Sequence, residues 1–152
     1  MDTSYFQFIF GLILAIVFGG AIGLEREYKK KEAGLQTYTL VALGSCLFTI
    51  IATNLFSFFS ARGNINFDPG RIILAVATGI GFIGAGVIIH RQDRVEGITT
   101  AAGLWVTASI GVATGIGLYM LAFIVTLLVI FILIVFGELE KFLFKRPLTK
   151  QK

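Results

Sequence analysis

The polar residues that could do chemistry gather where long uncharged stretches of the chain end. They are carboxylates, cations, hydroxyls and one histidine: Glu25, Arg26, Glu27, His90, Arg91, Asp93, Arg94, Glu96, Thr99 and Thr100. Mg²⁺ prefers carboxylates and water as ligands, and four carboxylates could supply them: Glu25, Glu27, Asp93 and Glu96. Ordinary solvated loops contain as many acids, so this metal signal is weak. No cofactor is expected, and Mg²⁺ is the one ion that these groups suggest.

Glu25 and Arg26 directly follow the first uncharged stretch. Adjacent residues point about 100° apart on a helix, so each is expected to pair with a residue of another segment. Such an ion pair could act as a structural lock between helices or as part of a cation site. Charges at membrane depth are costly unless they are paired, which favours the lock. Asp68 and Arg71 lie one helical turn apart and are expected to pair locally.

Other candidates stand near the expected helix ends. Asp68, Thr37 and Thr99 are placed to cap the third, second and fourth helices, because short polar side chains accept the free N–H groups there. Thr100 belongs to the same polar group as Thr99. Trp105, in the second turn of the fourth helix, is expected to anchor that helix at the membrane interface.

The residues indicate no enzyme. His90 and Cys46 are the single histidine and cysteine, so a zinc-type site or a nucleophile–histidine dyad is not expected. The run 79–84 matches G-x-G-x-x-G, but it lies inside an uncharged stretch, which favours helix packing over dinucleotide binding. Proton-coupled transporters commonly place an ionisable residue near the membrane midplane, and these stretches have none. A passive pathway lined by backbone and hydroxyl groups stays open.

Hydropathy then defines the elements that hold these residues. The 152 residues are 56% hydrophobic and 14% charged, with a mean hydropathy of +0.87, a composition typical of membrane proteins. A helical span needs about 20 mainly apolar residues. We therefore expect an all-α bundle of five transmembrane helices in one domain, 1–152. The expected spans are 5–24, 37–60, 72–89, 98–114 and 118–136, with a turn at 115–117 and a basic tail at 137–152.

The basic residues predict the orientation. Eleven of them follow the first, third and fifth spans, whereas the other side has only Arg62 and Arg71. Cytoplasmic loops carry the excess of Lys and Arg, so the N-terminus is expected outside and the C-terminus in the cytoplasm. The net charge of +4 follows from this pattern, with the lipid bilayer as the partner and no nucleic acid.

Small residues at four-residue spacing predict where helices touch, because they let membrane helices approach closely. The candidate packing glycines are Gly19, Gly23, Gly79, Gly81, Gly84, Gly86, Gly103 and Gly111. The first, third and fourth helices are expected at the centre of the bundle, and the fifth is expected to face lipid. The same faces could bind a second protomer. A homo-oligomer, with a dimer favoured, is expected, and whether these faces pack within or between chains stays open.

Three motifs resemble the signatures of the MgtC/SapB membrane proteins. Gly19–Glu27 with Ala33–Thr37 resembles the first, Arg71 with Gly79–Ile88 the second, and Val95–Trp105 the third. They occur in the family's order over about residues 11–120. The resemblance implies a multi-pass protein of the bacterial inner membrane that is associated with adaptation to low Mg²⁺. It also implies that these positions matter: Glu25, Arg26, Thr37, Arg71, Gly81, Gly84, Gly86, Thr99, Thr100 and Trp105.

The resemblance is closer to the SapB branch. Longer members add a soluble C-terminal domain, and MgtC-type members carry Asn-Thr and Trp-Cys where this chain has Thr99-Thr100 and Trp105-Val106. Some members act by engaging other membrane complexes. We therefore expect a non-enzymatic membrane protein that modulates a membrane partner or ion balance. The alternative is a small transporter or channel for a cation such as Mg²⁺ or for another small solute.

Overall fold

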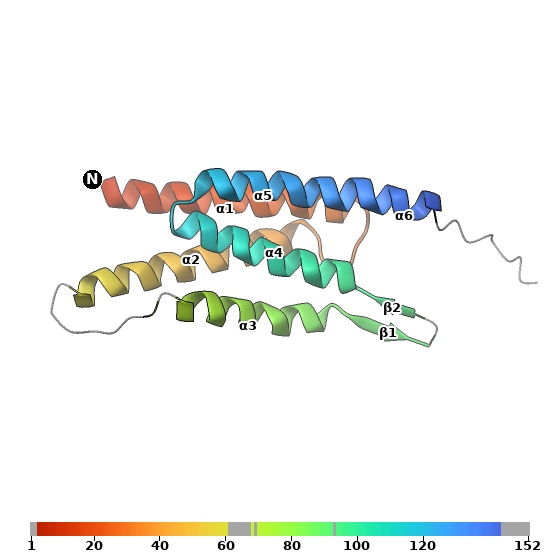
Figure 1. The fold of residues 1–152 in the computed structure, drawn as a ribbon, viewed down its shortest axis with the longest axis horizontal. Helices are drawn as coiled ribbons and strands as arrows, with labels where there is room; N and C mark the ends of the chain where they lie inside the picture. The colour runs from red at the N-terminus through yellow and green to blue at the C-terminus, as the bar shows by residue number, and fades with distance from the viewer. Residues whose placement is uncertain (1–2, 61–67, 69, 93, 144–152) are drawn as a thin grey trace, which may run out of the picture.

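The chain forms a bundle of helices that run back and forth along one long axis (Figure 1). A computed structural model describes residues 3–60, 68, 70–92 and 94–143. The helices in these ranges are α1 (Thr3–Tyr28), α2 (Leu35–Ser60), α3 (Gly70–Gly86), α4 (Ile98–Gly115) and α5 (Tyr119–Phe131). The fifth pass continues through a π-helical segment, η1 (Ile132–Phe136), into α6 (Gly137–Leu143).

Within the described ranges, four helical segments are long and apolar enough to cross a bilayer. These are Tyr5–Tyr28, Leu35–Ser60, Ile98–Gly115 and the continuous Tyr119–Glu140. The remaining apolar helix, α3, has 17 residues and so measures about 26 Å, against a hydrocarbon core of about 30 Å. The helical membrane fold is therefore confirmed, with α3 as the short member.

Three helix ends differ from the prediction by three residues or more, and the largest difference is at the fifth helix, which was expected to end at 136 and continues to Leu143. The first helix runs on to Tyr28, so Glu25 and Arg26 are helical residues rather than loop residues. The third helix ends at Gly86 instead of residue 89, because the chain there turns into an antiparallel hairpin of β1 (Ile89–Arg91) and β2 (Arg94–Glu96). The hairpin corrects the purely helical prediction. The turn expected at 115–117 does form, and Gly117 adopts a φ of 87° that favours glycine.

The centre of the bundle is α4, which contacts α1, α2, α3 and α5 as the glycine pattern predicted, and beside it lies α2, whose central place that pattern did not predict. α2 packs against α1 and α4, while α3 lies at the edge, mainly against α4. A Cβ placed on Gly19 of α1 would lie 2.7 Å from the carbonyl oxygen of Tyr38, and one on Gly115 of α4 would lie 2.7 Å from Cβ of Thr49. The small faces of α1 and α4 therefore meet α2 from two sides, and the two helices also touch each other, since a Cβ on Gly11 of α1 would lie 3.0 Å from the carbonyl oxygen of Thr114 on α4.

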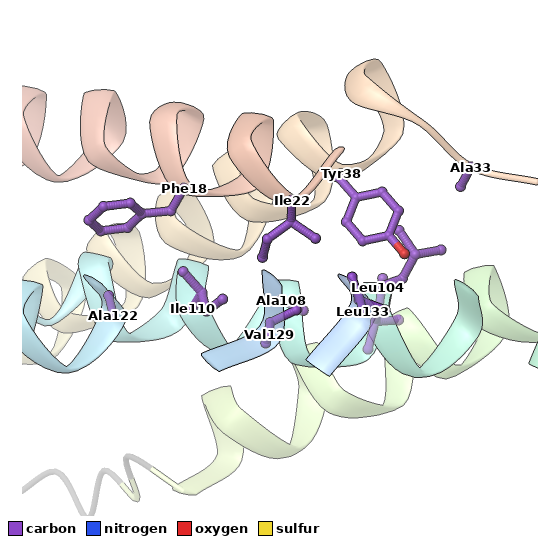
Figure 2. Close-up of a cluster of buried hydrophobic side chains, with 11 residues drawn as sticks. Phe18, Ile22, Ala33, Tyr38, Leu104, Ala108, Ile110, Ala122, Val129 and Leu133 are labelled. Carbon is purple, nitrogen blue, oxygen red and sulfur yellow. The ribbon is translucent and has the colours of Figure 1, made fainter. Parts of the chain in front are cut away.

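The main apolar core lies where α1, α2, α4 and α5 come together (Figure 2). Ile22, Tyr38 and Leu104 are fully buried there, and Ala122 and Val129 contribute from α5. The other face of the fifth helix is exposed, as Phe123, Leu127 and Phe131 show. Large apolar side chains on the outside of a membrane bundle contact lipid, as expected for this helix.

Candidate functional site

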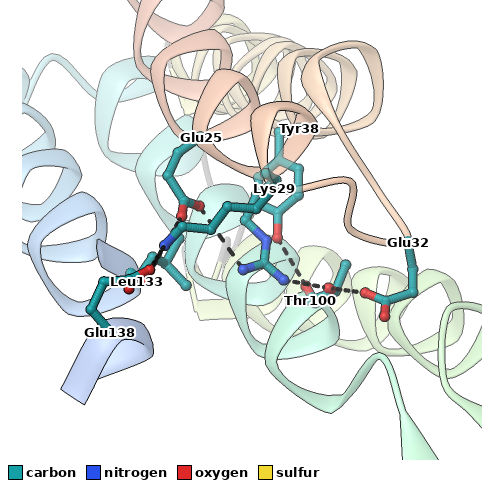
Figure 3. A network of polar contacts seen from close by, with 8 residues as sticks. Glu25, Lys29, Glu32, Tyr38, Thr100, Leu133 and Glu138 are labelled. Carbon is teal, nitrogen blue, oxygen red and sulfur yellow. Dashed lines mark hydrogen bonds and ion pairs between the residues drawn. The ribbon is translucent and has the colours of Figure 1, made fainter. Parts of the chain in front are cut away.

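A buried threonine joins four segments at the end of the bundle where α1 finishes. Nη2 of Arg26 donates a hydrogen bond to Oγ1 of Thr100 at 2.7 Å, and that hydroxyl donates to Oε2 of Glu32 at 2.5 Å. The Tyr38 hydroxyl donates to the carbonyl oxygen of Thr100 at 3.2 Å. Figure 3 shows these contacts converging from α1, the loop after it, α2 and α4. We call Arg26, Thr100, Glu32 and Tyr38 the threonine joint.

Beside the joint, Lys29 ties α1 to the fifth helix. Its Nζ lies 2.8 Å from Oε1 of Glu25, one helical turn earlier, and 4.0 Å from Oε1 of Glu138 on α6. The same ammonium donates to the carbonyl oxygen of Leu133 at 3.1 Å. Leu133 lies in η1, where the wider π-helical turn replaces the usual α-helical backbone hydrogen bonds. Lys29 therefore donates to a carbonyl oxygen at the point where the α-helical hydrogen-bond pattern is interrupted.

Arg26 of the joint and the adjacent Glu25 are charged side chains buried in the bundle. Arg26 is 3% exposed, and the side chain of Glu25 is 9% exposed, with 3.9 Å between Nη1 of Arg26 and Oε2 of Glu25. Among the described residues, neither Glu25 oxygen accepts a hydrogen bond and Nε of Arg26 donates none. The 2.8 Å contact of Glu25 with Lys29 is thus an ion pair without hydrogen-bond geometry. Removing one partner of such a pair leaves a charge out of water, which costs about 3–5 kcal/mol.

Glu32 lies at the exposed rim of the joint, outside the membrane-spanning segments. The hydrogen bond from the Thr100 hydroxyl is the main reason why the pKa of Glu32 is lower than its ordinary value, and burial opposes this weakly. The nearby Lys31 and Arg26 also lower the pKa. Glu32 therefore stays ionised at neutral pH and accepts the hydrogen bond as a carboxylate.

Three predicted residues do not join this site. Thr37 lies half-buried between α2 and α3, Thr99 is exposed next to the buried Thr100, and Trp105 is 53% exposed on α4. Thr37 and Thr99 also cap no helix, because α2 and α4 begin before them. Glu27 accepts the Leu35 N–H at 3.1 Å instead, and Gly97 precedes α4 in the left-handed conformation with no side-chain cap.

At the opposite end, Asp68 and Arg71 do not form the expected ion pair within the described part of the chain. Oδ1 of Asp68 accepts the N–H of Gly70 at 2.8 Å, as a capping residue does. Arg71 is exposed in the first turn of α3 and borders the groove between α2 and α3. The capping prediction for Asp68 is confirmed, and Arg71 forms no ion pair with a residue that the structure describes.

The three carboxylates suggested for Mg²⁺ that the structure describes do not converge. Glu25 faces Lys29, Glu27 caps α2, and Glu96 contacts Nε of Arg91 at 3.1 Å and Nε of Arg94 at 2.7 Å. Asp93 lies outside the described residues. Within the described ranges, His, Cys, Asp and Glu form no group of three or more that could hold a metal ion.

The predicted packing glycines fall into two groups. Those of α1 and α4 and one of α3 meet a neighbour: Gly19 and Gly23 meet α2, Gly103 and Gly111 meet Tyr38 and Ala42, and Gly84 meets Ala101. A Cβ on the other three would meet no atom of the described chain within 4 Å: Gly79, Gly81 and Gly86. These three positions of α3 have open space around them.

Sequence reasoning missed Lys29, Glu32 and Tyr38. Lys29 follows Glu25 by four residues, and this spacing places two residues on one helix face, so the pair could have been found. Glu32 and Tyr38 reach Thr100 across 68 and 62 positions of the chain, and no local pattern predicts such contacts. A cavity of about 720 Å³ adjoins the site and is bordered by Arg26, Lys29, Thr99 and Glu140 among others.

Long apolar helices joined by polar contacts at their ends define this chain as a multi-pass helical membrane protein. The chain belongs to the MgtC family, whose model matches residues 12–142. The identification agrees with the resemblance of its three motifs.

The chain is similar to several curated bacterial proteins. It is 44% identical over 133 residues to the Escherichia coli (strain K12) protein named "Putative magnesium transporter YhiD", covering 88% of this chain and 62% of that protein. It is 43% identical to SapB of Bacillus subtilis (strain 168) over 72% of this chain and 48% of SapB. It is 34% identical to MgtC of Salmonella typhimurium (strain LT2) over 96% of this chain and 59% of MgtC.

The matched regions thus span about half to three-fifths of these relatives. No solved structure matches the chain.

Proposed function

We propose that this protein is a non-enzymatic member of the MgtC family that takes part in Mg²⁺-related adaptation by modulating a membrane partner or ion balance. Support for a Mg²⁺-related role comes from the family and from the name of the YhiD relative. Support for modulation rather than transport comes from how the chain uses its own polar groups. The threonine joint is the observation that carries the proposal.

The charged side chains of the joint, and Lys29 beside it, each contact another group of the same chain. Arg26 is bound to Thr100, Lys29 to Glu25 and the Leu133 carbonyl, and Glu32 to Thr100. A cation site would instead need several free oxygen ligands around one point. Together with the hydrogen bond from Tyr38 to Thr100, these contacts join α1, α2, α4 and the fifth helix, so the polar groups act as a lock between helices.

The hydroxyls inside the helices are also engaged. Four buried threonines donate to carbonyl oxygens three or four residues earlier in their own helices: Thr49, Thr107, Thr114 and Thr126. All four side chains are at most 3% exposed, so among the described residues they line no open path for an ion. A passive pathway along these hydroxyls is therefore not favoured.

The second candidate is a small transporter or channel for Mg²⁺ or another small solute. One observation favours it: the Glu25 carboxylate is buried without a hydrogen bond among the described residues, near the cavity of about 720 Å³. A buried, incompletely paired carboxylate beside a polar cavity is the kind of group that ion pathways use.

We further propose that α3 is also a span and that the protein lies in the bacterial inner membrane as a homo-oligomer, with a dimer favoured. The end of the bundle that carries Lys29 and α6 would face the cytoplasm, because basic loops stay on that side. The open glycines Gly81 and Gly86 leave α3 room to pack on a second protomer. A cysteine at position 30 should then react with an impermeant thiol reagent only after the membrane is opened.

The function is tested by measuring Mg²⁺ entry into sealed liposomes that hold the purified chain and a Mg²⁺-sensitive dye. The proposal expects the same slow entry as in empty liposomes. It also expects the chain to change growth at limiting Mg²⁺ in a bacterium that lacks its own copy. The proposal would be overturned in favour of transport if Mg²⁺ entered faster than the leak of empty liposomes and Glu25→Gln abolished this extra flux while the variant still inserted and assembled.

A further inference from the structure

A second hollow lies on the other side of α2, between α2 and α3. The two helices run in opposite directions (Figure 1) and touch over only a short stretch. The groove between them has a volume of about 900 Å³ and an almost wholly apolar lining. At Gly44 and Gly79, which border it, a Cβ would meet no atom of the described chain within 4 Å. The groove is therefore a place where two membrane helices fail to close on each other.

The groove opens to the apolar outside of the bundle. Leu40, Phe48 and Ile51 of α2 border it on one face of that helix, and each is more than half exposed: 66%, 66% and 52%. Apolar side chains so exposed on a membrane helix lie against lipid. An apolar hollow next to lipid is filled by hydrocarbon, because an empty one would lose the dispersion contacts of its lining.

The length of the groove suits an acyl chain. On α3 it extends from Arg71 to Ile83, which are twelve residues apart and so separated by about 18 Å along the helix. One leaflet contributes about half of the roughly 30 Å hydrocarbon core. A chain that enters at Arg71 would therefore lie in the groove over the whole depth of one leaflet.

Arg71 gives this end of the groove a positive charge. It is exposed at the start of α3 and forms no ion pair with another described residue, while the nearby Asp68 carboxylate is engaged with the Gly70 N–H. A guanidinium binds phosphate through charge-assisted and often bidentate hydrogen bonds. An unpaired cation at the rim of an apolar groove complements a molecule that carries a phosphate at the end of a hydrocarbon chain.

We propose that the α2–α3 groove binds one membrane phospholipid, with an acyl chain between Gly44 and Gly79 and its phosphate on Arg71. A second copy of the chain fits less well. A twofold contact uses the same patch on both copies, so it would bring two Arg71 side chains towards each other at the rim. The lipid site is separate from the threonine joint, and its failure would leave the proposed function untouched.

The test measures phospholipid bound to the delipidated protein in detergent by native mass spectrometry, with phosphatidylglycerol as the probe. We expect each chain to bind one molecule of the added phosphatidylglycerol. Gly79→Leu should abolish this binding, because its side chain enters the groove where the protein has open space. Arg71→Gln should weaken it about tenfold, the loss of about 1.4 kcal/mol that one charge-assisted hydrogen bond supplies. Diacylglycerol, which lacks the phosphate, should bind to the same weakened extent.

Two matched variants control for general effects. Gly81→Leu adds the same side chain to α3 outside the groove lining, and Lys30→Gln removes an exposed cation at the other end of the bundle. Both should keep the bound lipid. Unchanged lipid binding in Gly79→Leu would overturn the proposal. If Gly79→Leu instead converts an oligomer to monomers by light scattering and leaves lipid binding intact, the groove is an interface between copies and the lipid site is refuted.

Discussion

Replacing Thr100 by valine keeps the shape of the side chain and removes the hydroxyl that the threonine joint is built on. Arg26 would lose its 2.7 Å acceptor, and at 3% exposure it has no water to replace it. A lost hydrogen bond to a buried charged group costs about 1.5–3 kcal/mol. Glu32 would lose its 2.5 Å donor, but it is exposed and can bind water at little cost. We therefore expect Thr100→Val to lower the free energy of unfolding by about 2 kcal/mol, nearly all of it through Arg26.

The measurement is reversible unfolding by SDS in mixed micelles, with matched controls. Thr107→Val makes the same change about two turns further along α4, where the buried hydroxyl donates only to the Gly103 carbonyl of its own helix. Its expected cost is about 0.5 kcal/mol, because that carbonyl keeps its backbone partner. Thr100→Ser retains the hydroxyl and should stay near the wild type. Equal losses for Thr100→Val and Thr107→Val would refute the view that Thr100 holds the buried guanidinium.

Three further outcomes follow from the same contacts. Gly19→Ala should lower the free energy of unfolding by about 1–3 kcal/mol through overpacking, because its Cβ would lie 2.7 Å from α2 atoms. In the same SDS titration, Gly81→Ala should leave this free energy unchanged or raise it. Lys29→Met removes the donor to the Leu133 carbonyl and the nearer of the two cations beside Glu25, so hydrogen exchange in η1 should accelerate. Lys29→Arg should slow it again, and unchanged exchange in Lys29→Met would contradict the contact between Lys29 and η1. Because the pKa of Glu32 is lowered in the folded state, its ionised form stabilises the fold at pH values above the ordinary carboxyl pKa, and this stability is lost as pH falls through the lowered pKa. Acidification should therefore destabilise the wild type more than Glu32→Gln. Parallel curves of stability against pH would disprove this.

Much of the fold could be predicted because hydropathy reports it directly. Uncharged stretches of the right length identified the helices, and the glycines at 115 and 117 marked the turn before the fifth helix. The place of each helix in the bundle could not be predicted in the same way. Gly19 and Gly111 indicate a close neighbour but not which one, and both meet α2, a helix with few small residues in regular spacing.

The site could be predicted only in part, for a similar reason. Glu25 and Arg26 were found because they directly follow the first uncharged span, where a charge at membrane depth is costly unless it is paired. The prediction that each would pair with another segment holds for Arg26, whose partner Thr100 lies 74 positions later. It is wrong for Glu25, which pairs with Lys29, the residue directly after its own helix, and Lys29 in turn reaches Leu133, 104 positions later. The secondary-structure propensities of neighbouring residues do not predict contacts between residues so far apart in the sequence. The hairpin at 89–96 was missed because two three-residue strands are too short to show an alternating pattern.

The central claim is that the buried ionic groups lock the helices and do not form a site that responds to Mg²⁺. The most direct measurement is the distance distribution between spin labels at Tyr28 and Val95, exposed positions at the end of α1 and in β2. It is recorded by double electron–electron resonance in lipid nanodiscs, first in EDTA and then in millimolar Mg²⁺. We predict one narrow distribution that is the same in both conditions. A Mg²⁺-dependent shift or a second population would contradict the lock and point to a cation-gated site.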